Sequence, residues 1–177
     1  MKGNNKIIWL LCIIILIVLT ACSASAETLN KEGRVYVDEG DLEQAIESFS
    51  EAIEADPDYV EAYNNLGNSY RKTGQLELAL NYLDQAIELD PNHYKAFKNR
   101  GKTMVALGEY EQALADFSRS IEIRPDYDQP YYDRALVFSE LGNLTAAARD
   151  MEFFLEISED QELAELARAK LKEFQGR

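Results

Sequence analysis

The sequence predicts an all-α protein in which one helix–turn–helix unit occurs four times and is followed by a single further helix. Two observations lead to this prediction, a strict 34-residue period and a helical spacing of apolar residues within each period. The period appears as Pro57, Pro91 and Pro125; Gly33, Gly67 and Gly101; Gly40, Gly74, Gly108 and Gly142; and Ala45, Ala79, Ala113 and Ala147. Coincidence does not place so many series in one register.

Each unit has the pattern of two helices joined by a turn, and the second unit shows it well. One face of its first helix carries Tyr63, Leu66, Gly67 and Tyr70. Gly74 follows, and glycine ends helices because it tolerates the left-handed backbone. The apolar face of the second helix consists of Leu76, Ala79, Leu80, Leu83, Ala86 and Ile87. We expect this helix to end before Pro91, because the residue that precedes proline is disfavoured in the α region.

These repeated positions resemble the tetratricopeptide repeat (TPR) family, whose 34-residue helix–turn–helix has the same order of small and large residues. The resemblance implies a right-handed α-solenoid with repeats at residues 26–59, 60–93, 94–127 and 128–161. It also implies that the first helix of each repeat lines a concave groove and that the second lies on the convex side. Residues 162–177 predict a capping helix, whose apolar face carries Leu163, Leu166, Ala167, Leu171 and Phe174.

Some positions depart from the family pattern. Arg100 and Arg134 stand where a leucine is usual, so we expect the close contact between helices there to be partly solvated. Phe154 occupies the position that Ala52 and Ala86 have in earlier repeats, and we expect its bulk to push the capping helix outward. Phe154 therefore indicates either a modified end unit or an exposed apolar docking patch.

The N-terminus has the three-part layout of a secretory signal peptide. Lys2 and Lys6 precede an uninterrupted apolar run over residues 7–19, and small residues follow. A helix of this length spans about 20 Å at roughly 1.5 Å per residue, which is shorter than the ~30 Å hydrocarbon core of a bilayer. We therefore expect export, with an uncleaved signal anchor as an alternative.

The small residues after the apolar run leave two cleavage sites open. Residues 19–22, Leu-Thr-Ala-Cys, resemble a bacterial lipobox, which implies that residues 1–21 are a lipoprotein signal peptide and that Cys22 is lipidated and anchored in the membrane. Residues 22–25 would then form a short tether before the first repeat. Residues 24–26, Ala-Ser-Ala, resemble an ordinary signal-peptidase site, which would remove residues 1–26 and release a soluble periplasmic or secreted protein. The lipobox is the more specific pattern, because it requires a cysteine directly after the apolar run.

The composition argues against several classes of function. With 32 acidic and 18 basic residues the net charge is −14, whereas nucleic-acid binding and docking on anionic lipid both need clustered positive charge. Cys12, Cys22 and a single histidine, His93, provide neither a disulfide framework nor a metal site. The sequence also has no phosphate-binding loop or nucleophile elbow, so it predicts no enzyme, no cofactor and no metal. We expect His93 to be solvated, because it lies in the turn after Pro91.

The charge is distributed unevenly between the two kinds of helix. The expected first helices of repeats two and three, 60–73 and 94–107, carry six basic side chains against one acid, Glu61. The expected second helices of the first three repeats carry ten acids against one base, Arg119. The pattern therefore predicts an acidic convex side and a positive central groove.

Family geometry implies a set of groove-facing residues that could bind a peptide. They are Asn30, Arg34, Asn64, Asn65, Asn68, Arg71, Lys95, Lys98, Asn99 and Lys102. Asparagine is a poor helix former, and its amide can both donate to and accept from the backbone of an extended peptide. Ordinary tolerance of asparagine on a solvated surface is the alternative interpretation.

A carboxylate clamp, which chaperone co-factors of the family use for a C-terminal carboxylate, matches only in part. Its positions map onto Asn30, Arg34, Asn65, Lys95 and Asn99. Only Asn65 and Lys95 match, so a clamp for cytosolic chaperone tails is not expected. An acidic or C-terminal peptide segment remains a candidate ligand.

Together these features predict a non-catalytic adaptor of the bacterial cell envelope that binds an extended, net-negative segment of an envelope or membrane protein. The alternative is a self-associating structural protein, a homo-oligomer in which Phe153, Phe154 and the capping helix pack against another copy.

Overall fold

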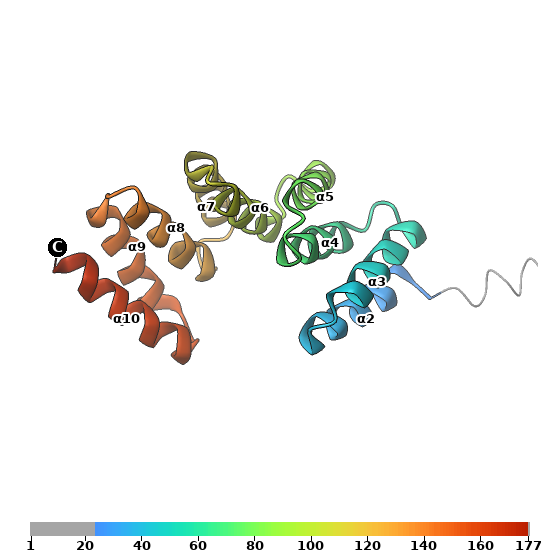
Figure 1. Ribbon diagram of the computed structural model, residues 1–177, viewed down its shortest axis with the longest axis horizontal. Coiled ribbons are helices and arrows are strands. Elements are labelled where there is room, and N and C mark those ends of the chain that lie inside the picture. The colour runs from blue at the N-terminus through green and yellow to red at the C-terminus, as the bar shows by residue number, and fades with distance from the viewer. Residues whose placement is uncertain (1–23, 177) are drawn as a thin grey trace, which may run out of the picture. The chain divides into compact units, whose positions relative to one another are not determined.

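A computed structural model describes residues 24–176, and every regular element in that range is an α-helix (Figure 1). In chain order the helices are α2 (Ala26–Glu39), α3 (Leu42–Ala55), α4 (Val60–Lys72), α5 (Leu76–Leu89), α6 (Tyr94–Leu107), α7 (Tyr110–Ile123), α8 (Gln129–Glu140), α9 (Leu144–Ile157) and α10 (Gln161–Gln175). The predicted all-α fold is confirmed. Among these helices, none combines the length and the apolar character that crossing a bilayer requires. The signal peptide and Cys22 lie outside the described residues, so cleavage and lipidation stay predictions.

The described part of the chain divides into two compact units, one that ends at Tyr59 and one that begins at Val60. In the first unit α2 and α3 pack together as one hairpin. Ser25 caps the start of α2, because its hydroxyl accepts a hydrogen bond from the Thr28 N–H at 3.2 Å. Phe49 from α3 is fully buried between the two helices, and Ala45 and Ala52 are buried beside it on the same helix. This hairpin is the first predicted repeat.

The second unit stacks three hairpins, α4–α5, α6–α7 and α8–α9. Because α5 contacts α6 and α7 contacts α8, the hairpins follow one another in chain order. The first helices of the hairpins also contact one another, and α6 lies between α4 and α8 (Figure 1). The three first helices therefore form one continuous surface.

Glycine ends the first helix of each hairpin, as the period predicted. Gly40, Gly74, Gly108 and Gly142 have φ angles between +77° and +84°. After α6, the Gly108 N–H donates to the Val105 carbonyl at 3.0 Å and the Glu109 N–H donates to the Met104 carbonyl at 2.9 Å. These two bonds satisfy carbonyl groups that the helix end leaves without an intrahelical partner.

The helix contact at Arg100 and Arg134 is partly solvated, since these side chains are 24% and 18% exposed, and an ion pair that was not predicted closes it. Arg100 donates through Nε and Nη2 to the two carboxylate oxygens of Asp116, at 2.8 and 2.7 Å. Arg134 forms the same bidentate pair with Asp150, at 2.6 and 2.9 Å. Each aspartate side chain is only 8% exposed, and these hydrogen bonds raise the pKa of Arg100 above its ordinary range. A partly buried ion pair between the two helices of one hairpin thus stands where the family usually has a leucine contact.

The last hairpin is covered by α10, which packs against α9. Ala167 and Phe174 from α10 share one core cluster with Met151 and Phe154 from α9, which confirms the predicted capping helix. Phe154 is fully buried, and its ring centroid lies 5.4 Å from that of Tyr132. Phe154 is therefore a core residue of a modified end unit, and the interpretation that it forms an exposed docking patch is wrong.

Candidate functional site

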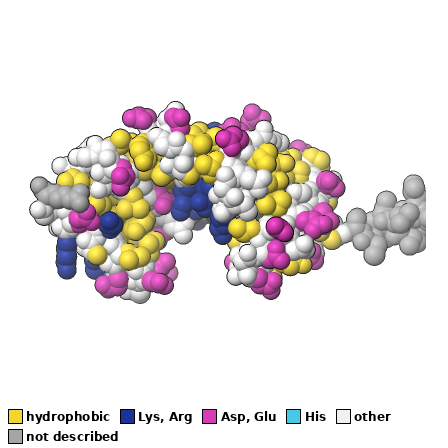
Figure 2. Space-filling view, in the orientation of Figure 1, with side chains coloured by type: hydrophobic (Ala, Val, Ile, Leu, Met, Phe, Trp, Pro, Cys, Tyr) yellow, Lys and Arg dark blue, Asp and Glu magenta, His cyan; other side chains and the backbone are white. Residues whose placement is uncertain are grey.

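The candidate site is the part of α4, α6 and α8 that faces away from the second helices; we call it the first-helix surface. It carries Asn68, Arg71, Lys95, Lys98, Lys102 and Asp133. Figure 2 shows dark blue side chains gathered over α6, in the part of the view between α8 and α4. The positive charge that the sequence predicted for this surface is therefore concentrated on α6.

Two of the predicted groove asparagines join α4 to α6. The Asn99 amide donates to the Asn64 side-chain oxygen at 2.8 Å, and the Asn64 amide donates to Asn65 at 3.2 Å. Asn64 and Asn99 are each only 5% exposed. Because their amides satisfy one another, these residues position the two helices and offer little to a ligand.

Arg71 is held in place by Asn68, one turn earlier on α4. Its Nε and Nη2 both donate to the Asn68 side-chain oxygen, at 3.3 and 2.9 Å. Partial burial lowers the pKa of Arg71 from its ordinary value. The guanidinium is therefore a fixed cation that is incompletely neutralised.

Lys98 is a half-buried cation of the surface. Its Nζ donates to Gln129 at 3.0 Å and lies 5.7 Å from the centre of the Tyr127 ring. The Tyr127 hydroxyl donates to the same Gln129 oxygen at 2.9 Å. Burial, together with the neighbouring positive charge of Lys102, lowers the pKa of Lys98 to about 8.

Asp133 on α8 is the carboxylate that faces these cations, and it was not among the residues predicted from the sequence. The Lys102 Nζ lies 3.6 Å from its Oδ1, and its side chain is 15% exposed. Burial raises the pKa of Asp133, although Lys102, Lys98 and Arg71 act in the opposite direction. Asp133 stands one repeat period after Asn99, so carrying the predicted groove positions into the fourth repeat would have found it.

The two groove residues predicted in the first repeat lie in the other compact unit. Asn30 is buried, and its amide donates to the Tyr59 hydroxyl at 3.5 Å. Arg34 is exposed on α2. Lys95, from the third repeat, is exposed at the start of α6, with its Nζ 5.8 Å from the centre of the Tyr94 ring.

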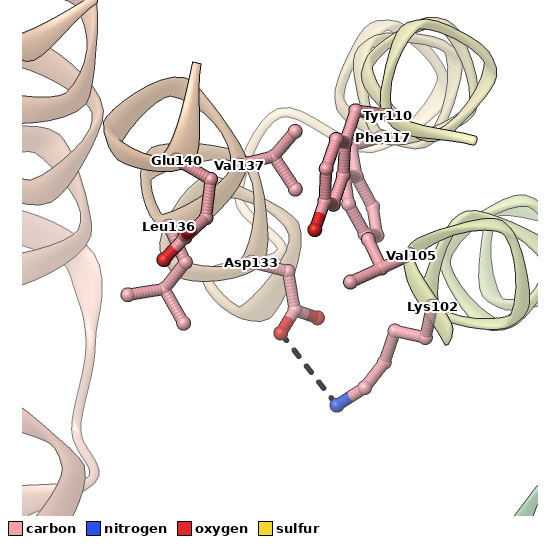
Figure 3. A pocket seen from close by; sticks show the side chains of 8 residues that line it. All are labelled: Lys102, Val105, Tyr110, Phe117, Asp133, Leu136, Val137 and Glu140. Atoms are coloured by element: carbon pink, nitrogen blue, oxygen red, sulfur yellow. Dashed lines mark ion pairs between the residues drawn. The ribbon is translucent and has the colours of Figure 1, made fainter. Parts of the chain in front are cut away.

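A cavity of about 340 Å³ adjoins the Lys102–Asp133 pair (Figure 3). It is lined by Lys102, Val105, Tyr110, Phe117, Asp133, Leu136, Val137 and Glu140, which come from α6, α7 and α8. Most of the wall is apolar. The Tyr110 hydroxyl points toward the cavity, and the ion pair stands at one side of it.

Models of known families decide the relationship that the repeats indicated. A model described as TPR repeat matches residues 33–74 and 101–142, and two described as tetratricopeptide repeat match residues 60–93 and 82–115. Together these matches span residues 33–142. The chain belongs to the tetratricopeptide repeat family.

Solved TPR structures resemble the fold over most of the chain. The crystal structure of MamA is 28% identical with a TM-score of 0.67, and the alignment covers 86% of this chain and 85% of that one. A thermophilic TPR protein from Thermus thermophilus is 23% identical with a TM-score of 0.78, covering 86% and 84%. The first TPR of Spaghetti, solved with the HSP90 peptide SRMEEVD, is 24% identical with a TM-score of 0.64, covering 68% and 95%. No curated protein matches the chain.

His93 is not the solvated turn residue that the sequence led us to expect. Its side chain is only 11% exposed, and burial lowers its pKa. Its Nδ1 lies 3.8 Å from an Asp90 carboxylate oxygen, while its Nε2 is buried and makes no hydrogen bond within the described residues. Within residues 24–176 no cluster of histidine, cysteine and acidic side chains could hold a metal ion. His93 therefore packs as part of the TPR turn between α5 and α6.

Proposed function

We propose that this TPR protein is a non-catalytic adaptor that binds an extended, acidic peptide segment of a partner protein on the first-helix surface. The observation that carries the proposal is the imbalance of charge at Asp133. Arg71, Lys98 and Lys102 all act on this one carboxylate, and Lys102 pairs with it at 3.6 Å.

The lowered pKa of Lys98 supports the same proposal. The pKa of this half-buried ammonium group is lowered to about 8, because the negative charge nearby does not offset the cost of its burial. A carboxylate from a ligand would supply that charge and form charge-assisted hydrogen bonds with the lysine. A related fold, the first TPR of Spaghetti, is solved with an acidic peptide, and the likeness to this chain is one of fold.

A charge-reversal experiment tests the proposal. The triple variant Lys95→Glu, Lys98→Glu and Lys102→Glu should lose at least tenfold in affinity for aspartate-rich peptides and fail to capture the partner from membrane extracts. Electrostatic steering also predicts that binding by the unchanged protein weakens as salt rises. Circular dichroism would verify that the triple variant is folded.

The matched control reverses three exposed lysines elsewhere, Lys31, Lys170 and Lys172, and changes the net charge by the same amount. This control should bind as the unchanged protein does. If both triple variants lose the same affinity for the peptides, or if neither loses any, a specific role for the first-helix surface is contradicted.

We also propose that the adaptor works in the bacterial cell envelope, anchored through a lipid on Cys22. The support is the order of charged, apolar and small residues that ends in this cysteine. Two or more acyl chains give a firm anchor, whereas one is marginal. Cys22→Ser should abolish labelling by a fatty-acid analogue and release the protein from the membrane fraction. Continued labelling would contradict lipidation, and a mature N-terminus at residue 27 would indicate the alternative cleavage site.

Self-association through the C-terminal repeat is the second candidate function. Phe154 is buried, but Phe153 is 37% exposed and Leu166 on α10 is 55% exposed. Light scattering on residues 27–177 separates the two proposals: a monomer favours the adaptor, and a dimer that Leu166→Lys dissociates favours self-association.

A further inference from the structure

The positions that line the cavity beside Asp133 hold more polar residues one repeat earlier. Moving each lining position back by one period gives Asn68, Arg71, Leu76, Leu83, Asn99, Lys102, Thr103 and Ala106. Val105 thus replaces Arg71, and two further aliphatic residues, Leu136 and Val137, replace Lys102 and Thr103. The apolar wall is therefore a property of the boundary between α6 and α8 and is not imposed by the repeat itself.

The cavity is continuous with the basic part of the first-helix surface. Lys102 belongs to both, since it lines the cavity and pairs with Asp133 at its edge (Figure 3). On α6 the residues Lys95, Lys98, Lys102 and Val105 are spaced so that they follow one face of the helix. A ligand that follows this face passes from positive charge to the apolar wall.

The length of that path sets a spacing in the ligand. Lys98 and Val105 are seven residues apart on α6, which is about 10 Å at roughly 1.5 Å per residue. An extended peptide advances about 3.3 Å per residue, so it covers this distance in about three residues.

The cavity suits one large apolar side chain. Its volume of about 340 Å³ is at the lower end of the range typical of sites for whole small molecules. Phe117 and Val137 form part of the cavity wall, and both belong to the buried core. The packing of α7 against α8 holds them in place. A leucine or phenylalanine side chain entering it would lose much of its contact with water.

We infer that the acidic segment bound by this protein carries one large apolar side chain, about three residues from its acidic residue, which inserts into the cavity between α6, α7 and α8. The inference rests on the proposed function and deepens it, because it states what the partner segment must contain. A small apolar molecule and a side chain of a second copy are the competing occupants that the test separates.

Fluorescence anisotropy with the full-length, detergent-solubilised protein tests the inference. The probes are labelled peptides of about ten residues with an Asp-Asp pair and one phenylalanine, placed at different distances from the pair. A phenylalanine three residues away should bind at least tenfold more tightly than its alanine counterpart, which corresponds to about 1.4 kcal/mol. Loss of the preference at other spacings is expected, and equal affinity of phenylalanine and alanine peptides at every spacing would overturn the inference.

Two variants place the effect in the cavity. Val105→Phe fills it, and Leu136→Lys installs the residue found at the equivalent position one repeat earlier. Both should remove the preference for phenylalanine while the alanine peptide still binds. Ala106→Phe is the matched control, because Ala106 is exposed on α6 and does not line the cavity. A preference that persists in both cavity variants, with both folded by circular dichroism, would overturn the inference.

The outcomes for the inference and for the proposed function are distinct. If no acidic peptide binds, the proposed function fails and the inference fails with it. If the alanine peptide binds and phenylalanine adds nothing, only the inference fails. Tight binding of a phenylalanine peptide whose aspartates are replaced by asparagine would show a site for apolar molecules that is independent of the acidic residue, which also overturns the inference. If raising the protein concentration displaces the peptide, a second copy of the protein occupies the cavity, and this outcome also overturns the inference.

Discussion

The two boundaries between first helices in the second unit, α4/α6 and α6/α8, share one architecture and differ in chemistry. At the α4/α6 boundary the buried Asn99 donates to Asn64 at 2.8 Å, so a neutral amide pair joins the helices. One period later the same two positions hold Asp133 and Lys98. The amide pair is self-sufficient, whereas Lys98 has a lowered pKa of about 8 and Asp133 a raised pKa, so the charged boundary is not fully satisfied. This difference is the reason for proposing that the ligand binds at the α6/α8 boundary.

Beneath these surfaces the α4–α5 and α6–α7 hairpins are packed in the same way. A Cβ added to Gly67 would lie 2.7 Å from Leu83 Cγ, and one added to Gly101 would lie 2.7 Å from Phe117 Cε1. Each glycine allows a large, fully buried side chain of the second helix to approach the first helix closely. The repeat thus keeps its buried contacts constant, while its exposed positions are free to specialise.

The largest predicted effect tests this shared packing. Phe117→Ala should lower the free energy of unfolding by about 3–5 kcal/mol, and Leu83→Ala by about 2–5 kcal/mol, because each leaves a cavity in the core. Urea unfolding followed by circular dichroism measures both. A loss below about 1 kcal/mol at either position would show that the two hairpins are not packed alike.

The next prediction concerns the ion pair inside the α6–α7 hairpin, which the α4–α5 hairpin lacks. Asp116→Ala should lower the free energy of unfolding by about 2 kcal/mol, because Arg100 loses both hydrogen bonds to a carboxylate that is 8% exposed. The double variant Arg100→Leu, Asp116→Tyr installs Leu66 and Tyr82, the residues at the equivalent positions one repeat earlier. It should recover most of the loss, since well-packed apolar residues often replace buried ion pairs without cost. A double variant as unstable as the single one would contradict the equivalence of the two hairpins.

These ion pairs mark where prediction from the sequence reached its limit. The 34-residue period was enough to predict the all-α repeat fold, the turn glycines and the capping helix, because these depend on local spacing and on buried small residues. Arg100 pairs with Asp116 and also with Asp84 on α5, and neither partner is predicted from the sequence, because each lies sixteen residues away on a helix assigned to the acidic convex side. A contact between helices requires the packing geometry, and the sequence period alone does not provide it.

The candidate site was predicted in part for the same reason. Lys98, Lys102 and Arg71 do lie on the first-helix surface, because helical periodicity fixes which face a residue occupies. Asn64 and Asn99 were expected to face a peptide, but each is buried by the other across two neighbouring helices. The cavity is formed by three helices together, so no single segment of sequence indicated it.

A third prediction uses the pKa of Lys98 to separate the charged boundary from the neutral one. Lys98 has a pKa of about 8 in the folded protein and about 10.4 when unfolded, so between these values the unfolded chain binds more protons. The contribution of Lys98 to stability therefore rises with pH across this window. Relative to Lys98→Met, the unchanged protein should gain about 1–2 kcal/mol between pH 8 and pH 10. If urea unfolding gives the two proteins free energies of unfolding that change with pH in the same way, the lowered pKa of Lys98 is contradicted.

Binding should respond to pH in the opposite direction. An acidic peptide favours the protonated form of Lys98, so its affinity should fall as the pH rises through about 8. Lys98→Arg keeps its charge in this range and should show no such fall. Together the two measurements test whether protonation of Lys98 controls both the stability of the protein and its affinity for the peptide.

The smallest predicted effect concerns Asp133, the residue that makes the α6/α8 boundary acidic as well as basic. Asp133→Asn should change the free energy of unfolding by less than about 1 kcal/mol, because its partner Lys102 is 38% exposed and the pair is long, at 3.6 Å. The same substitution should increase the affinity for an Asp-Asp peptide about threefold, since a carboxylate that repels the ligand is removed. Adding Lys98→Asn to it recreates the amide pair of the α4/α6 boundary and should cancel that gain. If Asp133→Asn alone instead weakens peptide binding, Asp133 positions Lys102 for the ligand. The two boundaries would then differ in the preorganisation of their side chains as well as in their charge.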